Sequence, residues 1–299
     1  MTKIILDEKL QKIFHYKDYP MKDFAYLRIG GKADYLFFPK DYDEVITIYN
    51  FSKENNIPFT IVGNCSNLII RDGGIRGFVV SLKKLNKINV NDNELTTQAG
   101  AQLIWASFIA LKHSLSGLEF ACGIPGTIGG AVAMNAGAYD SEIKDVLKSC
   151  EVLTNEGKIV TKTKEELDYS YRSSSILKNK EIVLSATFSL QKGNYQEIKD
   201  KMLELTKKRL EKQPLEYPSC GSVFKRPKGY YVGKLIQDAK LQGLRIGDAM
   251  VSTKHAGFII NTNKATAKDY ISLINLIRKK IYDEFNILLE QEVLIIGEE

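Results

Sequence analysis

The stretch GIPGTIGGAVAMNAGAY, residues 123–139, is the part of the sequence that decides the fold. It lies within an uncharged run from Phe120 to Tyr139, and ~20 uncharged residues are the length of a membrane-spanning helix. However, its five glycines and Pro125 oppose a stable helix, and no positively charged flank supports membrane insertion. We therefore predict that this segment forms a buried, glycine-rich loop structure.

A second glycine-containing turn, VGNCSN at residues 62–67, lies between two predicted strands, 58–62 and 68–70. Glycine lets the backbone approach a ligand closely, and successive N–H groups in a turn form a cradle for anions. Two such turns would suit the two phosphates of a dinucleotide. Neither GxGxxG nor GxxxxGK[ST] occurs, so the Rossmann and P-loop fingerprints do not apply. The alternative, that the glycines serve only tight packing, stays open for each turn.

Predicted helices and strands alternate along the chain, but the strands are short and irregularly spaced, which favours the α+β class. A helix is expected after Asp41 and Glu44, because their spacing is that of a capping box. The other main predicted helices are 103–111, 195–212 and one beginning at Thr266, and further predicted strands are 33–40, 78–80, 182–190 and 287–296.

The composition excludes several classes of protein. The 299 residues are 44% hydrophobic and 26% charged, which excludes wholesale disorder. A net charge of +6 favours an anionic small ligand as readily as nucleic acid, and no Lys/Arg tract is long enough to indicate a polyanionic partner. Four dispersed cysteines without a CxxC pair, and three histidines without HxxH spacing, argue against a metal site. The N-terminus has no signal-peptide pattern, so we expect a cytoplasmic protein.

Three further segments carry side chains suited to chemistry. Arg172, within YRSSS, offers a fork of donors for a carboxylate. Ser222 lies beside a glycine and ahead of two cations, but no GxSxG motif occurs and no histidine offers an evident base. With period two, Glu292 shares a largely apolar strand face with Leu288 and Leu294, where a carboxylate is costly unless paired or functional. For each residue taken alone, a purely structural role stays open.

Together these segments resemble one family, that of UDP-N-acetylenolpyruvoylglucosamine reductase, a flavoprotein of bacterial peptidoglycan precursor synthesis. The resemblance covers nearly the whole chain and rests on seven motifs in the family's order. These are RIGG (28–31), VGNCSN (62–67), GIPGTIGGAVAMNAGAY (123–139), YRSS (171–174), GSVFKRP (221–227), KHAGFIIN (254–261) and LEQEVLIIG (289–297).

The resemblance implies a two-lobed FAD-binding domain of the vanillyl-alcohol-oxidase type followed by a C-terminal α+β substrate domain. The implied ranges are 1–85, 86–205 and 206–299. FAD, bound non-covalently, would pass a hydride from NADPH to the enolpyruvyl ether of the sugar nucleotide, giving UDP-N-acetylmuramate. The cofactor-binding residues implied by the motifs are Ile61, Gly63, Asn64, Cys65, Ser66, Asn67, Gly123, Pro125, Gly126, Thr127, Gly129, Gly130 and Ala131.

The resemblance also implies the roles of the catalytic and substrate-binding residues. Arg172 would stabilise the carboxylate and the enolate formed by hydride addition at C3, Glu292 would orient that arginine or a water, and Ser222 would deliver a proton to C2. The substrate-binding residues are expected to be Tyr171, Lys212, Lys225 and Arg226.

Two departures from the family pattern are visible. Cys65 occupies the position of a second glycine, where a positive φ would cost a non-glycine residue ~1 kcal/mol. The segment around Tyr171 lacks room for an inserted tyrosine loop, so the chain resembles the shorter subclass. The alternatives are another FAD-dependent oxidoreductase of the same fold and a non-catalytic flavin-binding protein. We expect a monomer that binds small molecules, with no metal, nucleic-acid or membrane partner.

Overall fold

The computed structural model describes residues 4–299. The chain divides into two compact units that alternate along the sequence. The first unit consists of Met1–Tyr16, Tyr35–Gly63 and Gly77–Lys208, and the second of Lys17–Asp34, Asn64–Arg76 and Arg209–Glu299. Two N-terminal segments therefore belong to the same unit as the C-terminal residues. The lobe assignment 1–85, 86–205 and 206–299 stays a prediction.

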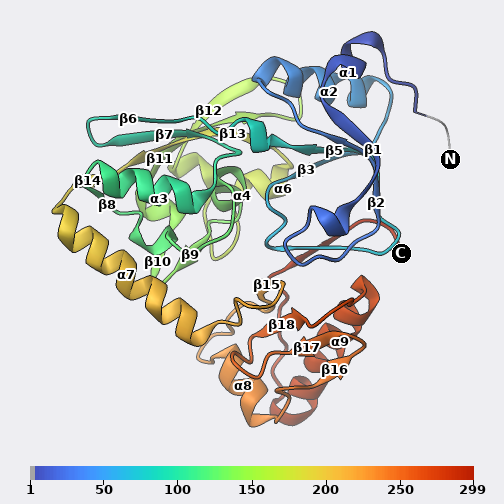
Figure 1. The fold of residues 1–299 in the computed structure, drawn as a ribbon, viewed down its shortest axis with the longest axis vertical. Coiled ribbons are helices and arrows are strands. Elements are labelled where there is room, and N and C mark those ends of the chain that lie inside the picture. Colours follow the sequence, from blue (N-terminus) through green and yellow to red (C-terminus); the bar gives the residue numbers. More distant parts are fainter. Residues whose placement is uncertain (1–3) are drawn as a thin grey trace. The chain divides into compact units, whose positions relative to one another are not determined.

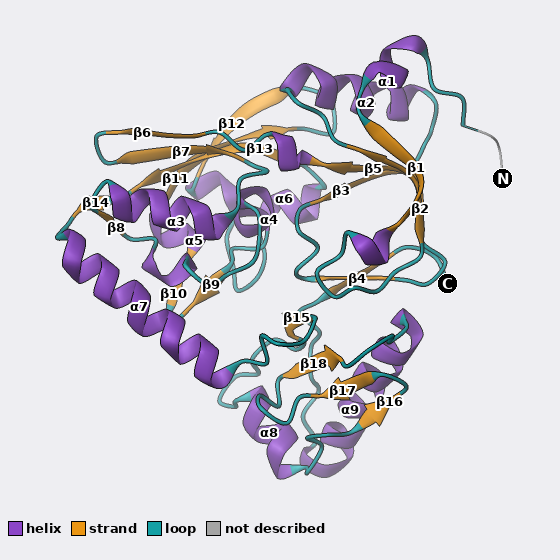
Figure 2. Ribbon diagram, viewed as in Figure 1, coloured by secondary structure: helices purple, strands orange, loops and turns teal. Residues whose placement is uncertain are grey.

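The first unit is built around a five-stranded antiparallel sheet with the order β12-β11-β13-β7-β6. The strands are β6 (Ile88–Asn91), β7 (Glu94–Gln98), β11 (Leu147–Leu153), β12 (Ile159–Thr163) and β13 (Ile182–Ser189). The central strand β13 is buried along most of its length, because both of its faces carry apolar residues. Figure 2 shows α4 (Ile128–Ala133) below this sheet, where it contacts β13 and β7.

Further helices of the first unit follow β7 in the sequence. They are α3 (Leu103–Lys112), α5 (Ile143–Val146), α6 (Ser175–Asn179) and α7 (Tyr195–Lys212), which continues into the second unit. The apolar side of α7 carries Ile198, Met202 and Leu205, which form a small cluster with Leu111 and Cys122. Two short ribbons complete this region: β8 (Leu115–Ser116) with β14 (Gln191–Lys192), and β9 (Gly137–Ala138) with β10 (Ser141–Glu142).

A four-stranded sheet has the order β1-β2-β5-β3 (Figure 1). Its strands are β1 (His15–Pro20), β2 (Lys32–Phe37), β3 (Phe59–Val62) and β5 (Ile75–Ser81), of which β3 and β5 pair in parallel. The N-terminal helices are α1 (Glu8–Lys12) and α2 (Tyr42–Glu54). Asp41 caps α2 by accepting from the amide of Glu44 at 2.9 Å, as the sequence predicts. Val45 and Ile48 of α2 join Phe37 and Phe78 in the core.

The second unit contains a four-stranded antiparallel sheet with the order β15-β18-β17-β16 and two helices. Its elements are β15 (Ser219–Ser222), α8 (Val232–Asp238), β16 (Arg245–Ile246), β17 (Ala249–Val251), β18 (Phe258–Asn261) and α9 (Ala267–Phe285). A parallel pair, β4 (Leu68–Ile70) and β19 (Leu294–Ile296), also belongs to it. Leu27, Ile29 and Ile69 pack in the same core as Tyr270 of α9.

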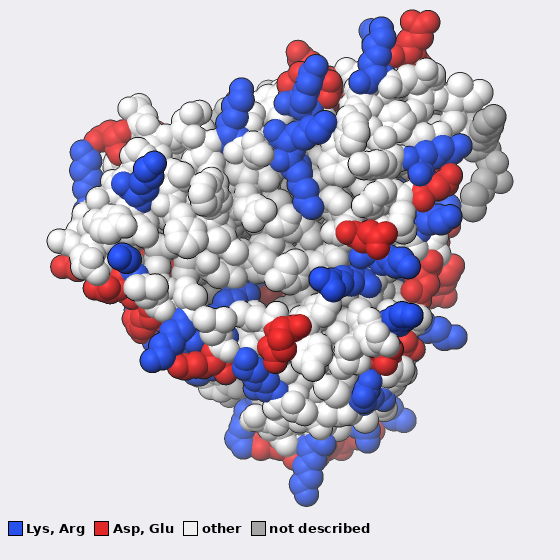
Figure 3. Space-filling view, in the orientation of Figure 1, with Lys and Arg blue, Asp and Glu red and all other residues white. Residues whose placement is uncertain are grey.

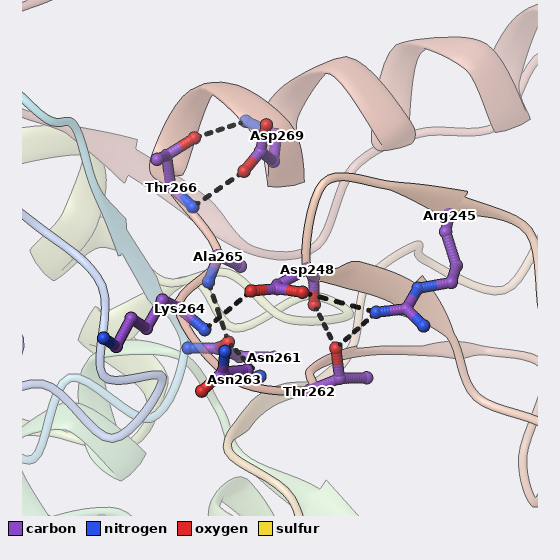
Figure 4. Close-up of polar contacts among 9 residues, drawn as sticks. All are labelled: Arg245, Asp248, Asn261, Thr262, Asn263, Lys264, Ala265, Thr266 and Asp269. Atoms are coloured by element: carbon purple, nitrogen blue, oxygen red, sulfur yellow. Dashed lines mark hydrogen bonds and ion pairs between the residues drawn. The ribbon is translucent and has the colours of Figure 1, made fainter.

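The start of α9 is fixed by polar groups, as Figure 4 shows. Thr266 accepts from the amide of Asp269, and the Asp269 carboxylate accepts from the amide of Thr266, which forms the capping box. The side chain of Asn261 accepts from two backbone amides of the loop that leads into the helix. Figure 4 also shows Asp248 contacting Arg245 and the amide of Lys264. These contacts are structural, and they anchor β17 and β18 to α9.

Two predictions about secondary structure are wrong in part. Residues 123–139 are not a loop throughout, because α4 forms in their centre on the Thr127 cap. The predicted strand 287–296 is a strand only at Leu294–Ile296, with an isolated bridge at Gln291. Leu288 is 70% exposed whereas Leu289 and Val293 are buried, so the apolar face proposed for Glu292 does not exist.

Within residues 4–299, no helix is long and apolar enough to cross a membrane. Over the same residues, no group of three or more His, Cys, Asp or Glu side chains is arranged to hold a metal ion.

Candidate active site

The first amides of α4 are engaged within the protein. The amide of Ile128 donates to the carbonyl of Ala101 at 2.9 Å, and that of Gly129 donates to the carbonyl of Ala99 at 2.8 Å. Thr127 caps the helix by accepting from the amide of Gly130. A Cβ on Gly129 would lie 3.0 Å from that of Ala99. At Gly129, glycine therefore permits close packing of α4 on the segment that follows β7.

Gly63 and Thr127 bring the two glycine-containing segments together within the first unit. Gly63 follows the last residue of β3, and a Cβ built on it would lie 2.4 Å from Oγ1 of Thr127. Real Cβ atoms essentially never approach a neighbour so closely. A side chain at Gly63 would therefore have to displace that of Thr127, and the sequence segments proposed to hold one cofactor meet at this point.

Cys65 adopts the backbone conformation of the glycine that it replaces. Its φ is +53°, in the left-handed region, and its side chain is buried. The expected positive φ is thus confirmed, at a strain cost of ~1 kcal/mol. Its carbonyl accepts from the amide of Leu68, and the carbonyl of Leu68 accepts from the thiol of Cys220 at 3.2 Å. These bonds connect the turn to β15, which stabilises the left-handed backbone conformation of Cys65.

Arg172 also has a strained backbone, with a φ of +55°. Its guanidinium donates to the carbonyl of Gly137 at 2.9 Å and to that of Asn135 at 3.4 Å. The guanidinium carbon lies 4.9 Å from the ring centre of Tyr171, which is 47% exposed. Strain of this kind persists only where surrounding contacts impose it. The arginine predicted to be catalytic is therefore held in place by backbone carbonyls that follow α4.

Asn135 is a residue of this region to which the sequence interpretation gave no role. It is fully buried, its amide nitrogen donates to the carbonyl of Ser170 at 3.2 Å, and its Oδ1 accepts from the amide of Lys144 at 3.0 Å. Because its own carbonyl accepts from Arg172, Asn135 links the end of α4 to the turn that carries this arginine. The signal available in the sequence was a polar residue inside the uncharged run.

Ser222 and Glu292 come together within the second unit. Glu292 donates its amide to the carbonyl of Val223 at 2.8 Å, and the amide of Lys225 donates to the carbonyl of Glu290 at 2.8 Å. Ser222 donates its hydroxyl to the carbonyl of Phe224 at 3.2 Å. The C-terminal segment is thereby paired with the loop that follows β15. The pairing is non-local, so the sequence pattern could not locate it.

The cations expected to bind substrate differ in their surroundings. Lys212 is exposed at the end of α7, and the guanidinium of Arg226 lies 3.8 Å from the ring centre of Tyr231, which is 65% exposed. Lys225 pairs with the exposed carboxylate of Glu290. Exposed pairs of this kind contribute little to stability, so Lys225 can change partners at low cost.

Comparisons with known proteins place the chain in a class. A family model described as an FAD binding domain matches residues 33–163. Another, described as the C-terminal domain of UDP-N-acetylenolpyruvoylglucosamine reductase, matches residues 213–296. The chain is thus an FAD-dependent oxidoreductase, and the predicted α+β fold with an FAD-binding part and a C-terminal domain is confirmed.

The individual relatives agree in name. UDP-N-acetylenolpyruvoylglucosamine reductase of Exiguobacterium sibiricum is 55% identical over 94% of this chain and 92% of its own length. The protein of that name from Clostridium novyi is 51% identical over 99% of this chain and 98% of its own. The crystal structure of the Thermus caldophilus enzyme matches with a TM-score of 0.81, at 32% identity, over 96% of this chain and 99% of that one. This chain belongs to the UDP-N-acetylenolpyruvoylglucosamine reductase family.

FAD fits the residues present. Gly63 lies without a side chain where the two motif segments meet, and Cys65 keeps the left-handed conformation that occurs in turns which cradle anions. The amides of Ile128 and Gly129, however, already donate hydrogen bonds to backbone carbonyls within residues 99–101. The chain thus uses FAD as its cofactor, whereas the assignment of individual residues from Ile61 to Asn67 and from Gly123 to Ala131 stays a prediction.

Proposed function

We propose that this chain catalyses the NADPH-dependent reduction of the enolpyruvyl ether of UDP-N-acetylglucosamine-enolpyruvate to UDP-N-acetylmuramate. When bound, FAD supplies the hydride chemistry that carries two electrons from NADPH to the sugar nucleotide. Membership of the reductase family supports this activity. The observation that carries it in the structure is the pairing of Glu292 with the backbone beside Ser222.

The reaction requires a cation near the carboxylate of the substrate and an acid near C2. Hydride addition at C3 leaves negative charge on C2 and the carboxylate, which preorganised donors stabilise. Arg172 is the proposed donor, and its fixed guanidinium supports that role because little reorganisation is needed. Ser222 is the proposed proton donor to C2. Glu292 is proposed to orient the arginine or a water.

The substrate-binding roles follow from charge. We assign the diphosphate to Lys212, Lys225 and Arg226, and a contact with the substrate to Tyr171. Exposure of Lys212 and Arg226 supports this assignment, since both can reach an anion in solution. The proposed cofactor residues are the two motif segments, 61–67 and 123–131. The ranges 1–85 and 86–205 are proposed as FAD-binding lobes and 206–299 as the substrate domain.

We further propose a cytoplasmic monomer without a nucleic-acid partner. On the face drawn in Figure 3, Lys and Arg side chains are interspersed with Asp and Glu, which supports small anionic ligands over a polyanion. Light scattering coupled to size exclusion checks the monomer, with a mass of 33.7 kDa for one chain as the expectation.

The function is tested by an anaerobic absorbance spectrum of the purified holoprotein. We expect NADPH to bleach the flavin absorbance and the enolpyruvyl sugar nucleotide to restore it without oxygen. Bleaching that this substrate does not reverse would favour another flavin-dependent oxidoreductase. A flavin that NADPH does not bleach would favour a binding protein without turnover.

A further inference from the structure

His255 and Ser222, which are distant in sequence, both lie close to Gly257. Its ring is half-buried and packs edge-on against Phe258, with ring centres 4.7 Å apart. A Cβ built on Gly257 would lie 3.3 Å from Nδ1 of His255 and 3.6 Å from Oγ of Ser222. The imidazole and the serine hydroxyl are therefore both neighbours of the same glycine.

A chain of hydrogen bonds joins the imidazole to the backbone that carries the serine. The amide of Gly257 donates to Nδ1 of His255 at 3.2 Å, and the carbonyl of Gly257 accepts from the amide of Val223 at 3.0 Å. Val223 directly follows Ser222, and its carbonyl accepts from Glu292. Gly257 is thus hydrogen-bonded both to the His255 ring and to Val223, the residue that links Ser222 to Glu292.

The protonation state of His255 decides whether this chain of bonds is complete. Because Nδ1 accepts a hydrogen bond, the neutral ring carries its proton on Nε2. Burial lowers the pKa of His255 below 6.5, a backbone hydrogen bond opposes this, and the charge of Lys212 on α7 lowers it further. The ammonium group of Lys254 forms an ion pair with Glu216 and donates a hydrogen bond to the carbonyl of Leu210. On α8, Lys234 forms an ion pair with Asp238.

We propose that His255 is a positioning residue for Ser222, acting through Gly257 and Val223. The neutral imidazole accepts from Gly257 and so fixes the backbone that orients the serine hydroxyl. Protonation replaces the acceptor at Nδ1 by a donor, which breaks the bond and releases the Gly257 amide. The proposal deepens the proposed function and rests on it for the role of Ser222. Its consequence is an acidic limb in the rate of sugar-nucleotide reduction that belongs to His255.

Two variants separate positioning from packing. His255→Phe keeps a ring against Phe258 but removes the acceptor, whereas His255→Asn keeps an oxygen acceptor near the place of Nδ1 and does not titrate. His113→Asn is the control, because His113 is exposed at the end of α3. Flavin reduction by NADPH and flavin reoxidation by the enolpyruvyl sugar nucleotide are measured separately as functions of pH. The same variants are checked by circular dichroism and by FAD content.

For the holoenzyme we expect reoxidation in His255→Phe to be roughly tenfold slower or more, since small misplacements of a reacting group have effects of this size. Flavin reduction by NADPH should change little. His255→Asn should recover much of the rate and lose the acidic limb, and His113→Asn should retain both. An acidic limb that persists in His255→Asn, or full reoxidation in folded His255→Phe, would overturn the proposal.

A nuclear magnetic resonance titration tests the proposal independently of activity. We expect neutral His255 to carry its proton on Nε2. The amide signals of Gly257 and Val223 should shift with pH, with a midpoint at the pKa of the His255 ring. Amide signals that stay unchanged while the His255 ring titrates, or a proton on Nδ1 of the neutral ring, would contradict the proposal even in an active enzyme. If the sugar nucleotide fails as a substrate while the amides do follow the ring, the proposed function fails and the coupling to the Ser222 backbone stands.

Discussion

Gly63 and Thr127 approach so closely that a Cβ on Gly63 would lie 2.4 Å from Oγ1 of Thr127. One residue follows β3 and the other caps α4, so the contact joins two segments that are about sixty positions apart in the sequence. The contact allows a direct test of whether the fold or the cofactor requires the glycine.

Gly63→Ala should destabilise the FAD-free protein by ~1–3 kcal/mol, because the added methyl must displace the Thr127 side chain. Denaturant unfolding measures this effect. Gly130→Ala is the control, since its Cβ would lie 3.5 Å from Oγ1 of Thr127, which is an ordinary contact. Thr127→Ala added to Gly63→Ala should recover part of the loss, and strict additivity of the two changes would contradict the close contact.

At position 65, a glycine variant should be at least as stable as an alanine variant, although alanine is usually the more stabilising of the two residues. Both Cys65→Gly and Cys65→Ala lose the buried thiol, but only alanine retains the strain of a φ of +53°. We expect the glycine variant to be at least as stable as the alanine variant in urea unfolding. An alanine variant that is clearly more stable would mean that the turn relaxes out of the left-handed region.

Asn135→Leu should destabilise the protein by ~1–3 kcal/mol, because the carbonyl of Ser170 and the amide of Lys144 lose their hydrogen bonds to the side chain and leucine is strained at the φ of +44°. It should also slow the reoxidation of FAD by the sugar nucleotide, since the side chain of Asn135 binds the carbonyl of Ser170 in the turn that carries Arg172. Asn286→Leu is the matched control, because Asn286 has a similar left-handed backbone, with a φ of +54°, but is exposed. Equal effects of the two substitutions would argue against the anchoring role.

Ser222→Ala should slow reoxidation by the enolpyruvyl sugar nucleotide by about a hundredfold or more, the size of a general-acid contribution. Reduction by NADPH should proceed as in the native protein. Ser219→Ala, at the start of the same strand, serves as the control and should affect neither half-reaction. The assignment of Ser222 is lost if its alanine variant turns over at the full rate.

The features predicted from sequence are those set by local patterns. Helix α7 was expected at 195–212 and forms at Tyr195–Lys212, because its apolar residues recur with helical period. The helix expected from Thr266 forms as α9, because Tyr270, Ile274 and Ile277 recur on one buried face. The helix within 123–139 was missed because glycines lower helix propensity, whereas packing on β13 stabilises α4 in the structure.

The parts of the candidate site that escaped prediction depend on contacts between distant segments. The proximity of His255 to Ser222 arises from the pairing of β15 with β18, and the role of Asn135 from a turn some thirty-five residues away. Neither contact leaves a periodic signal in the sequence. The motif resemblance located Arg172, Ser222 and Glu292 as candidates, and the structure supplies the partners of each.

The division of the chain into alternating segments has a consequence for its synthesis. Leu27 and Ile29 belong to the same core as Leu289 and Val293. While the ribosome is still extending the chain, these early residues have no complete core to enter, so the second unit matures only once the last residues are released. A fragment confined to residues 213–296 would lack part of its own interior, and therefore cutting the gene at that boundary would not yield an autonomous domain.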